Sequence, residues 1–117
     1  MPQTDPEAPI ATQVRTLLAS MPSAALPITY QQLASALGLM PPRTIQRVAQ
    51  ALEQLMKEDV AAGRPMIAAL VVSRRGDGLP APGFFQQAVA LGRFPADPSQ
   101  HEALYMAERE KALESRN

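Results

Sequence analysis

The stretch from Pro42 to Ala62 constrains the fold most, because it carries the longest apolar stripe in the chain. Apolar residues recur in it at three- and four-residue spacing, at Ile45, Val48, Ala49, Leu52, Leu55 and Met56. This spacing predicts a helix that buries one side and exposes the other. Proline is tolerated in a first helical turn, and Gly63 is a typical terminator. The exposed side is predicted to carry Arg43, Gln46, Arg47, Gln50 and Gln54.

A shorter helix is predicted directly before it. Thr29 and Gln32 have the spacing of a capping box, in which the hydroxyl accepts from the third helical amide and the glutamine reaches back. The helix should therefore begin at Tyr30, and Gly38 should end it in a left-handed conformation. Leu33 gives this helix an apolar side. Together the two helices form a helix-turn-helix candidate.

The remaining elements are assigned from periodicity and from turn residues. The expected elements are a helix over Pro9–Ser20, a strand over Ala68–Ser73, a turn at Gly76–Gly78, a helix over Phe84–Leu91 and a last helix opened by Asp97, Pro98 and Gln100. Pro80 and Pro82 lack amide donors, so a second strand there would pair only at an edge.

These elements predict a mainly α fold with a small β element, a winged helix-turn-helix-like single domain with additional C-terminal helices. The 117 residues are enough for one modest core. We expect a loose leader over 1–8, the winged-helix-like domain over 9–94 and the C-terminal helix over 95–117. That helix is mostly charged, so we expect it to fray or to pack on a partner. The predicted core consists of Ile10, Val14, Leu17, Leu33, Leu37, Ile45, Val48 and Leu52, with a short strand at Leu70–Val72.

Charge gives no global argument for nucleic acid, because 11 basic residues balance 11 acidic ones. Locally, the stretch from Arg43 to Arg75 holds six basic and three acidic residues, and the balance reverses after Phe94. The sequence lacks cysteine, which excludes disulfides, thiolate zinc sites and cysteine nucleophiles. The first residues do not resemble a signal peptide, and no apolar run approaches the roughly 20 residues of a membrane span. We expect a cytoplasmic protein without a cofactor.

The segment from Thr29 to Ala34, followed by Gly38 and by Val48, Ala49 and Ala51, is similar to the helix-turn-helix of alkylguanine-DNA alkyltransferases and alkyltransferase-like proteins. The resemblance spans roughly residues 28–72. It implies docking in the DNA minor groove, with Tyr30 helping to rotate a nucleotide outward. The arginine that fills the vacated stack in that family aligns with Gln46, one residue before Arg47. Common winged-helix geometry accounts for the same pattern equally well.

The family's Pro-Cys-His-Arg motif has no counterpart here. It should fall in Met66–Val72, where Ala68 and Ala69 occupy the cysteine and histidine places. Without a thiol there is no acceptor for an alkyl group, so we expect no alkyl transfer. A pocket for an alkylated base is not expected either, because this segment has the pattern of a plain strand.

Other catalytic or metal-binding patterns are weak. His101 lacks the second histidine of a zinc-binding helix and is expected at the surface. Glu108, Glu110 and Glu114 are weak candidates for an acid and a base, because Glu110 and Glu114 share a helix face beside Lys111 and Arg109, as on a solvated surface. Met40, Met56, Met66 and Met106 are expected to fill gaps in a core or an interface. We therefore expect no enzyme and no metal site.

Two function classes remain open. The first is non-catalytic binding of double-stranded DNA by residues 29–56 and a basic wing. Its candidate contacts are Tyr30, Arg43, Gln46, Arg47, Gln50, Gln54, Arg64, Arg74 and Arg75. The second is a protein-interaction module on the same scaffold, without DNA binding. Its candidate contacts are Phe84 and Phe85.

Overall fold

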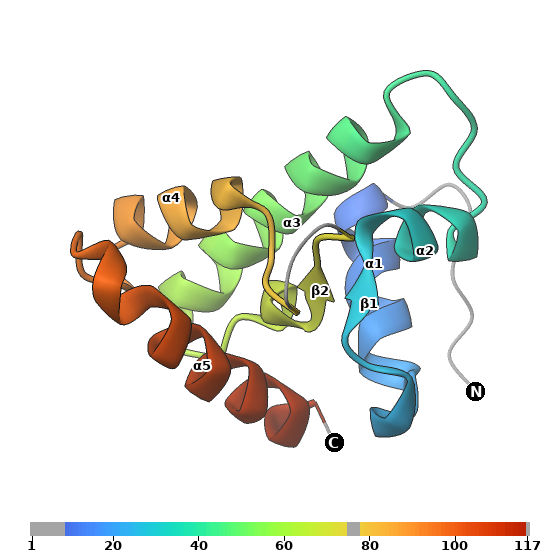
Figure 1. The fold of residues 1–117 in the computed structure, drawn as a ribbon. Coiled ribbons are helices and arrows are strands. Elements are labelled where there is room, and N and C mark those ends of the chain that lie inside the picture. Colours follow the sequence, from blue (N-terminus) through green and yellow to red (C-terminus); the bar gives the residue numbers. More distant parts are fainter. Residues whose placement is uncertain (1–8, 75–77, 117) are drawn as a thin grey trace.

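The computed structural model describes residues 9–74 and 78–116, and these form a mainly helical globule with one small sheet (Figure 1). The leader at 1–8, Arg75 and most of the turn expected at Gly76–Gly78 lie outside the described residues. The five α-helices among them are α1 (Ile10–Ser20), α2 (Tyr30–Ala36), α3 (Thr44–Ala61), α4 (Pro82–Ala90) and α5 (His101–Ser115). Three short 3-10 turns are η1 (Ser23–Ala25), η2 (Ile67–Leu70) and η3 (Pro98–Gln100).

The sheet consists of two strands, one directly before α2 and one after α3 in the sequence. Strand β1 (Ile28–Thr29) runs parallel to β2 (Val71–Val72), with Ile28 opposite Val71. A parallel pair requires a long crossover connection, and α2, α3 and η2 provide it here. The mainly α fold with a small β element is confirmed. Strand β2 pairs with β1 and not with residues 79–83, of which 79–81 lead into α4 and 82–83 form its first turn.

Local sequence signals place α2 as expected. The hydroxyl of Thr29 accepts from the amide of Gln32 at 3.1 Å, and the side chain of Gln32 accepts from the amide of Thr29 at 3.0 Å. This capping box confirms the predicted start at Tyr30. Gly38 follows the helix with φ of 69°, the left-handed conformation that glycine adopts without a Cβ clash.

Helix α3 begins two residues later than expected, at Thr44, because Arg43 itself adopts a left-handed conformation with φ of 62°. Val48, Leu52, Leu55 and Met56 are buried along it, which confirms most of the predicted stripe. Ile45 is an error in the predicted core, since its side chain is 40% exposed. Ile10, Leu17 and Leu37 are half-buried and pack against the core from its margin.

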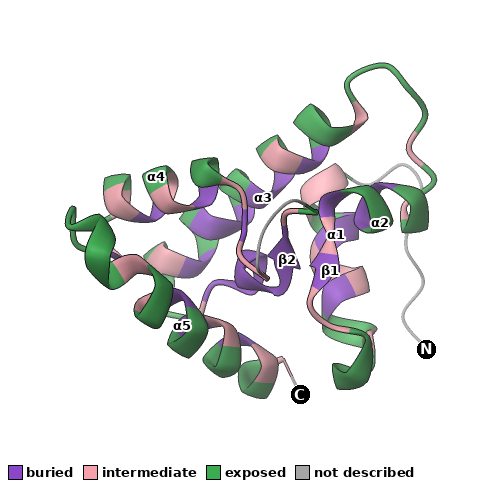
Figure 2. Ribbon diagram, viewed as in Figure 1, coloured by how far each residue is buried: buried purple, intermediate pink, exposed green. Residues whose placement is uncertain are grey.

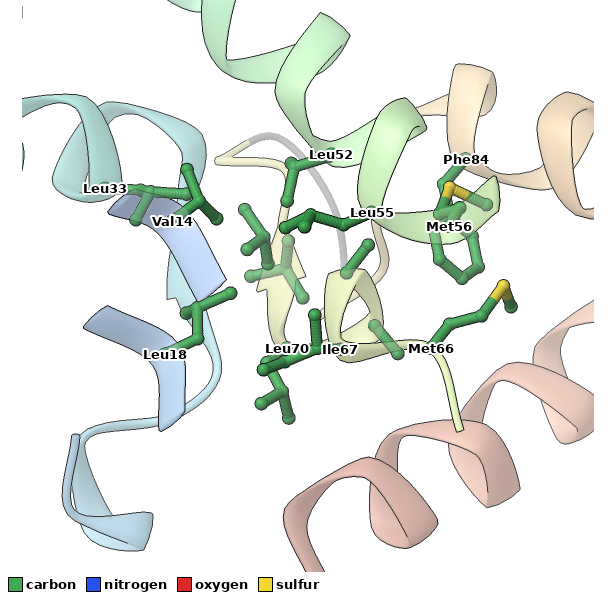
Figure 3. Packing of buried hydrophobic residues seen from close by; sticks show 14 of the residues in the cluster. Val14, Leu18, Leu33, Leu52, Leu55, Met56, Met66, Ile67, Leu70 and Phe84 are labelled. Carbon is green, nitrogen blue, oxygen red and sulfur yellow. The ribbon is translucent and has the colours of Figure 1, made fainter. Parts of the chain in front are cut away.

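The core lies between α1, α3 and η2 (Figure 3). Figure 3 shows Val14 and Leu18 of α1 and Leu52 and Leu55 of α3 on either side of the central turn. The whole segment from Met66 to Val72 is buried. The plain strand expected from Ala68 is therefore wrong in its first half, which is the η2 turn.

Hydrogen bonds from polar side chains, and not a strand ladder, hold the η2 turn in place. The carboxylate of Asp59 accepts from the amide of Ile67 at 2.9 Å, and that of Glu108 accepts from the amide of Met66 at 2.7 Å. Tyr105 donates its hydroxyl hydrogen to the carbonyl of Ala69 at 2.8 Å. Because these groups satisfy buried backbone atoms, η2 is stable away from any sheet.

Helix α5 is part of the core. Tyr105, Glu108 and Ala112 are buried against η2, so the expected fraying is wrong, whereas Glu110 and Glu114 are exposed as expected. Arg93 neutralises the Glu108 carboxylate at 2.7 Å. Of the methionines expected to fill gaps, Met56 and Met66 do so, whereas Met40 and Met106 are exposed. No helix in the described part of the chain is long and apolar enough to cross a membrane.

Candidate nucleic-acid interface

The outward side of the first half of α3 carries a row of polar side chains, which we call the α3 surface and define as Arg43, Gln46, Arg47 and Gln50. All four residues are exposed, while Val48 and Leu52 on the opposite side anchor the helix in the core (Figure 2). Arginine and glutamine side chains donate hydrogen bonds to phosphates and to base edges. The sequence placed these four residues correctly on one exposed side.

The α3 surface lies in a stretch of sequence without acidic residues, which ends at Glu53, one helical turn after Gln50. Between residues 8 and 52 the chain contains arginine but neither aspartate nor glutamate. Arg15, the other arginine there, pairs with Asp59 at 3.0 Å and with Glu58 at 3.3 Å. Arg43 and Arg47 therefore keep their positive charge unpaired by any carboxylate in the described residues. This local excess is compatible with an anionic ligand although the whole chain is neutral.

Gln54 and Arg64 are less suited to the same surface. Gln54 is exposed, but its amide donates to the carboxylate of Glu58 at 3.1 Å. Arg64 follows the far end of α3, which has 18 residues and so a length of about 27 Å. Its guanidinium pairs with Asp59 at 3.1 Å. Arg64 thus stabilises the end of α3 at a site remote from Arg43.

Arg74 lies beside α2. It is exposed just after β2 and lines a shallow hollow together with Thr29, Gln31, Gln32 and Ser35. The hollow therefore combines one guanidinium with amide and hydroxyl donors. The other wing candidate, Arg75, lies outside the described residues.

Tyr30 lies at the wall of an apolar cavity. Its ring is 9% exposed, and its hydroxyl accepts from the amide of Ala81 at 3.1 Å. Burial is the main cause that raises the pKa of the Tyr30 hydroxyl above its ordinary value of 10.0, and the Ala81 hydrogen bond partly opposes it. The cavity lies among α3, η2 and α4. Its lining is Tyr30, Ile45, Ala49, Leu52, Glu53, Met56, Ala68, Ala81, Gly83 and Phe84.

The size of this cavity limits what it accepts. Its volume is about 100 Å³. An apolar cavity of about 150 Å³ accepts benzene, and a purine base is larger than benzene. A rotated base therefore does not fit without movement of the walls. The sequence pattern gave no sign of this cavity, because it forms only when Tyr30 and Ala68 come together through the β1 and β2 pairing.

The two aromatic candidates for a protein interface occupy different environments. Phe84 is 6% exposed and packs edge-on against Phe94 and Tyr105, so it belongs to the core. Phe85 is half-buried, and its ring stacks on His101 with centroids 5.5 Å apart. Only Phe85 contributes to a surface groove, whose apolar wall includes Leu79, Pro80, Pro82 and Val89.

Sequence reasoning missed one exposed apolar residue beside the α3 surface. Met40 is 73% exposed in the segment between α2 and α3. The available signal was its position between Gly38 and Pro41, outside the apolar stripes of both helices. No cluster of three or more potential metal ligands occurs within 9–74 and 78–116.

Comparisons with protein-family models, with curated proteins and with solved structures gave no match to this chain.

Proposed function

We propose that this protein binds double-stranded DNA without catalysing a reaction on it. The observation that carries the proposal is the α3 surface, where two arginines and two glutamines are exposed at the start of a firmly anchored helix, in a stretch of sequence without carboxylates. Arg43 supplies a phosphate contact, and Arg47 and Gln50, farther along the helix, are the candidates for reading base edges.

The chain after β2 serves as the wing in this proposal. The amide of Ser73 donates to the carbonyl of Leu79 at 2.8 Å, which closes a loop next to α2. Arg74 at the start of this loop lies beside the first turn of α2 and supplies a further phosphate contact. The position of Arg74 beside α2 supports winged-helix-like binding.

The proposal includes kinship with alkyltransferase-like proteins. Tyr30 and Ala68 line the same cavity, and these are the positions that match the family's tyrosine and its reactive cysteine. This convergence supports a common scaffold. Alkyl transfer is not part of the proposal, because an alanine side chain is no nucleophile.

Binding of a labelled duplex, measured by fluorescence anisotropy over a series of salt concentrations, tests the proposal. The logarithm of the affinity should fall linearly with the logarithm of the salt concentration, by about 0.9 per phosphate contacted. Arg43→Ala should reduce that slope by about 0.9 if Arg43 contacts one phosphate. Lys111→Ala, which removes the same charge from the exposed side of α5, should leave it unchanged. Equal slopes for both variants would contradict the proposed surface.

A protein-interaction module is the second candidate function. The groove beside Phe85 favours it, because prolines and aliphatic side chains line it, with Pro82 exposed and Leu79, Phe85 and Val89 half-buried. A folded sample that forms no complex with duplex DNA even at low salt would exclude the DNA proposal and leave this groove as the candidate site.

A further inference from the structure

The connection between α2 and α3 is longer than a helix-turn-helix requires. The usual turn has about three or four residues, whereas here the whole of 37–43 separates the helices. Figure 1 shows this segment arching away from every other element of the fold. Met40, Pro41 and Pro42 are exposed in it, so the projecting part of the connection is apolar.

Met40 stands out among the exposed apolar side chains. Three large apolar residues are exposed in the described chain, and Met40 at 73% exceeds Met106 at 44% and Ile45 at 40%. An apolar side chain stabilises a fold by being buried, so the exposed Met40 thioether adds no such stability. Its exposure is therefore consistent with burial against another molecule.

The base of the connection is fixed. The amide of Leu39 donates to the carbonyl of Ala34 at 3.1 Å, and the Leu39 side chain packs at the margin of the core. On the other side, Arg47 approaches the carbonyl of Met40 at 3.5 Å. Contacts on both sides limit how far Met40 moves relative to the helices, so it is presented in a defined position.

The charge around Met40 identifies the class of its partner. Arg43 follows Met40 by three residues, the guanidinium of Arg47 approaches the Met40 carbonyl, and no carboxylate occurs in the sequence between residues 8 and 52. An apolar tip next to two arginines suits a polyanion with an apolar interior, which describes base-paired DNA. Minor-groove proteins commonly insert Met, Leu, Ile, Phe or Pro side chains between base pairs in this way.

We propose that Met40, supported by Pro41 and Pro42, is a wedge that inserts between stacked base pairs when the α3 surface binds DNA. This inference rests on the proposed DNA binding. It adds a defined action on the duplex, which is local unstacking.

The test uses a duplex of repeated TA steps in which 2-aminopurine replaces some of the adenines. TA steps unstack most easily, and the repeat makes binding registers equivalent. The emission of 2-aminopurine rises when the base loses its stacking partner. We expect saturating wild-type protein to raise the emission several-fold. Met40→Ala should abolish most of the rise but keep the salt slope, with an affinity within about tenfold of wild type.

Two variants control for other effects. Met106→Ala removes an equally large exposed side chain from α5 and should behave as the wild type. Met40→Leu retains an apolar side chain of similar size and should restore the rise. Because residue 40 is exposed, equal thermal midpoints for all variants are expected and show that each is folded.

The possible results distinguish the insertion of Met40 between base pairs from DNA binding by the α3 surface. Binding without a rise in emission, or a full rise with Met40→Ala, would overturn the wedge and leave the proposed function intact. Absence of any DNA complex at low salt would overturn both, and would assign the exposed tip to a protein contact.

Discussion

The carboxylate of Asp59 and the amide of Ile67 lie 2.9 Å apart, and this bond ties the last turns of α3 to the central η2 turn. Asp59 is fully buried, and its other oxygen pairs with Arg15 and Arg64 at 3.0 and 3.1 Å. A single carboxylate thus joins α1, the end of α3 and η2.

Asp59→Ala should destabilise the protein strongly, because it leaves the buried amide of Ile67 unpaired and removes one of the two carboxylate partners of Arg15. We expect a loss of about 3 kcal/mol in the free energy of unfolding, measured by urea denaturation. Glu58→Ala is the matched control. Glu58 is exposed, so the loss of its pair with Arg15 should cost less than about 1 kcal/mol. Similar losses for the two variants would contradict the bridging role of Asp59.

Leu52→Ala should cost about 2 to 5 kcal/mol, because Leu52 is buried on the central stripe of α3 and its truncation leaves a void. Gln50→Ala on the exposed side should change stability by less than about 0.5 kcal/mol. Thermal denaturation of both variants measures the difference. Equal midpoints would mean that the orientation of α3 is wrong.

Arg43→Gly should stabilise the fold while it weakens DNA binding. Arg43 has φ of 62°, a conformation that costs a non-glycine residue roughly 1 to 2 kcal/mol. Glycine avoids this cost but has greater freedom in the unfolded chain, so we expect a net gain of up to about 1 kcal/mol. Denaturation and anisotropy on the same sample measure both effects. A variant that is less stable than the wild type would show that the Arg43 side chain contributes contacts to the fold.

Stability should fall as the pH rises above about 10, the ordinary tyrosine pKa. Burial is the largest cause that raises the pKa of both Tyr30 and Tyr105, so the folded state holds its phenolic protons when the unfolded state has begun to lose them. Their contribution is complete below the unfolded pKa and is lost as the pH rises toward the folded pKa. Thermal midpoints measured in alkaline buffers test this. Tyr30→Phe should show a shallower decline than the wild type, and an unchanged decline would assign the effect to other groups.

Alkylated duplex DNA should bind no more tightly than unmodified duplex. The cavity beside Tyr30 and Ala68 measures about 100 Å³, which is too small for a rotated base. Competition anisotropy with a duplex containing one alkylated guanine measures the ratio of affinities. A preference beyond tenfold, worth about 1.4 kcal/mol, would show that the cavity opens to admit the lesion.

The sequence predicted features that depend on neighbouring residues. The capping box of α2 and the buried stripe of α3 are local patterns, and both are confirmed. The η2 turn was missed because one of its hydrogen bonds comes from Glu108, 42 residues away from Met66. Tyr105 was missed for a similar reason, since no apolar period on α5 marks it as buried.

The same distinction applies to the candidate interface. Exposure of Arg43, Gln46, Arg47 and Gln50 followed from helical periodicity. The pairing of Arg64 with Asp59 did not, because it depends on how the chain turns back after α3. The apolar cavity was equally inaccessible to pattern analysis, since its walls come from separate elements.

The parallel pairing of β1 and β2 also closes a loop of about 40 residues that contains α2 and α3, and such closure costs chain entropy. The hydrogen bonds of a ladder with two residues per strand offset only a small part of that entropy cost. The ladder therefore forms only when α2 and α3 are docked on the core. Hydrogen exchange at the amides of this short ladder consequently reports the docking of the helices that carry the proposed DNA-binding surface, and a ligand that stabilises them should slow the exchange.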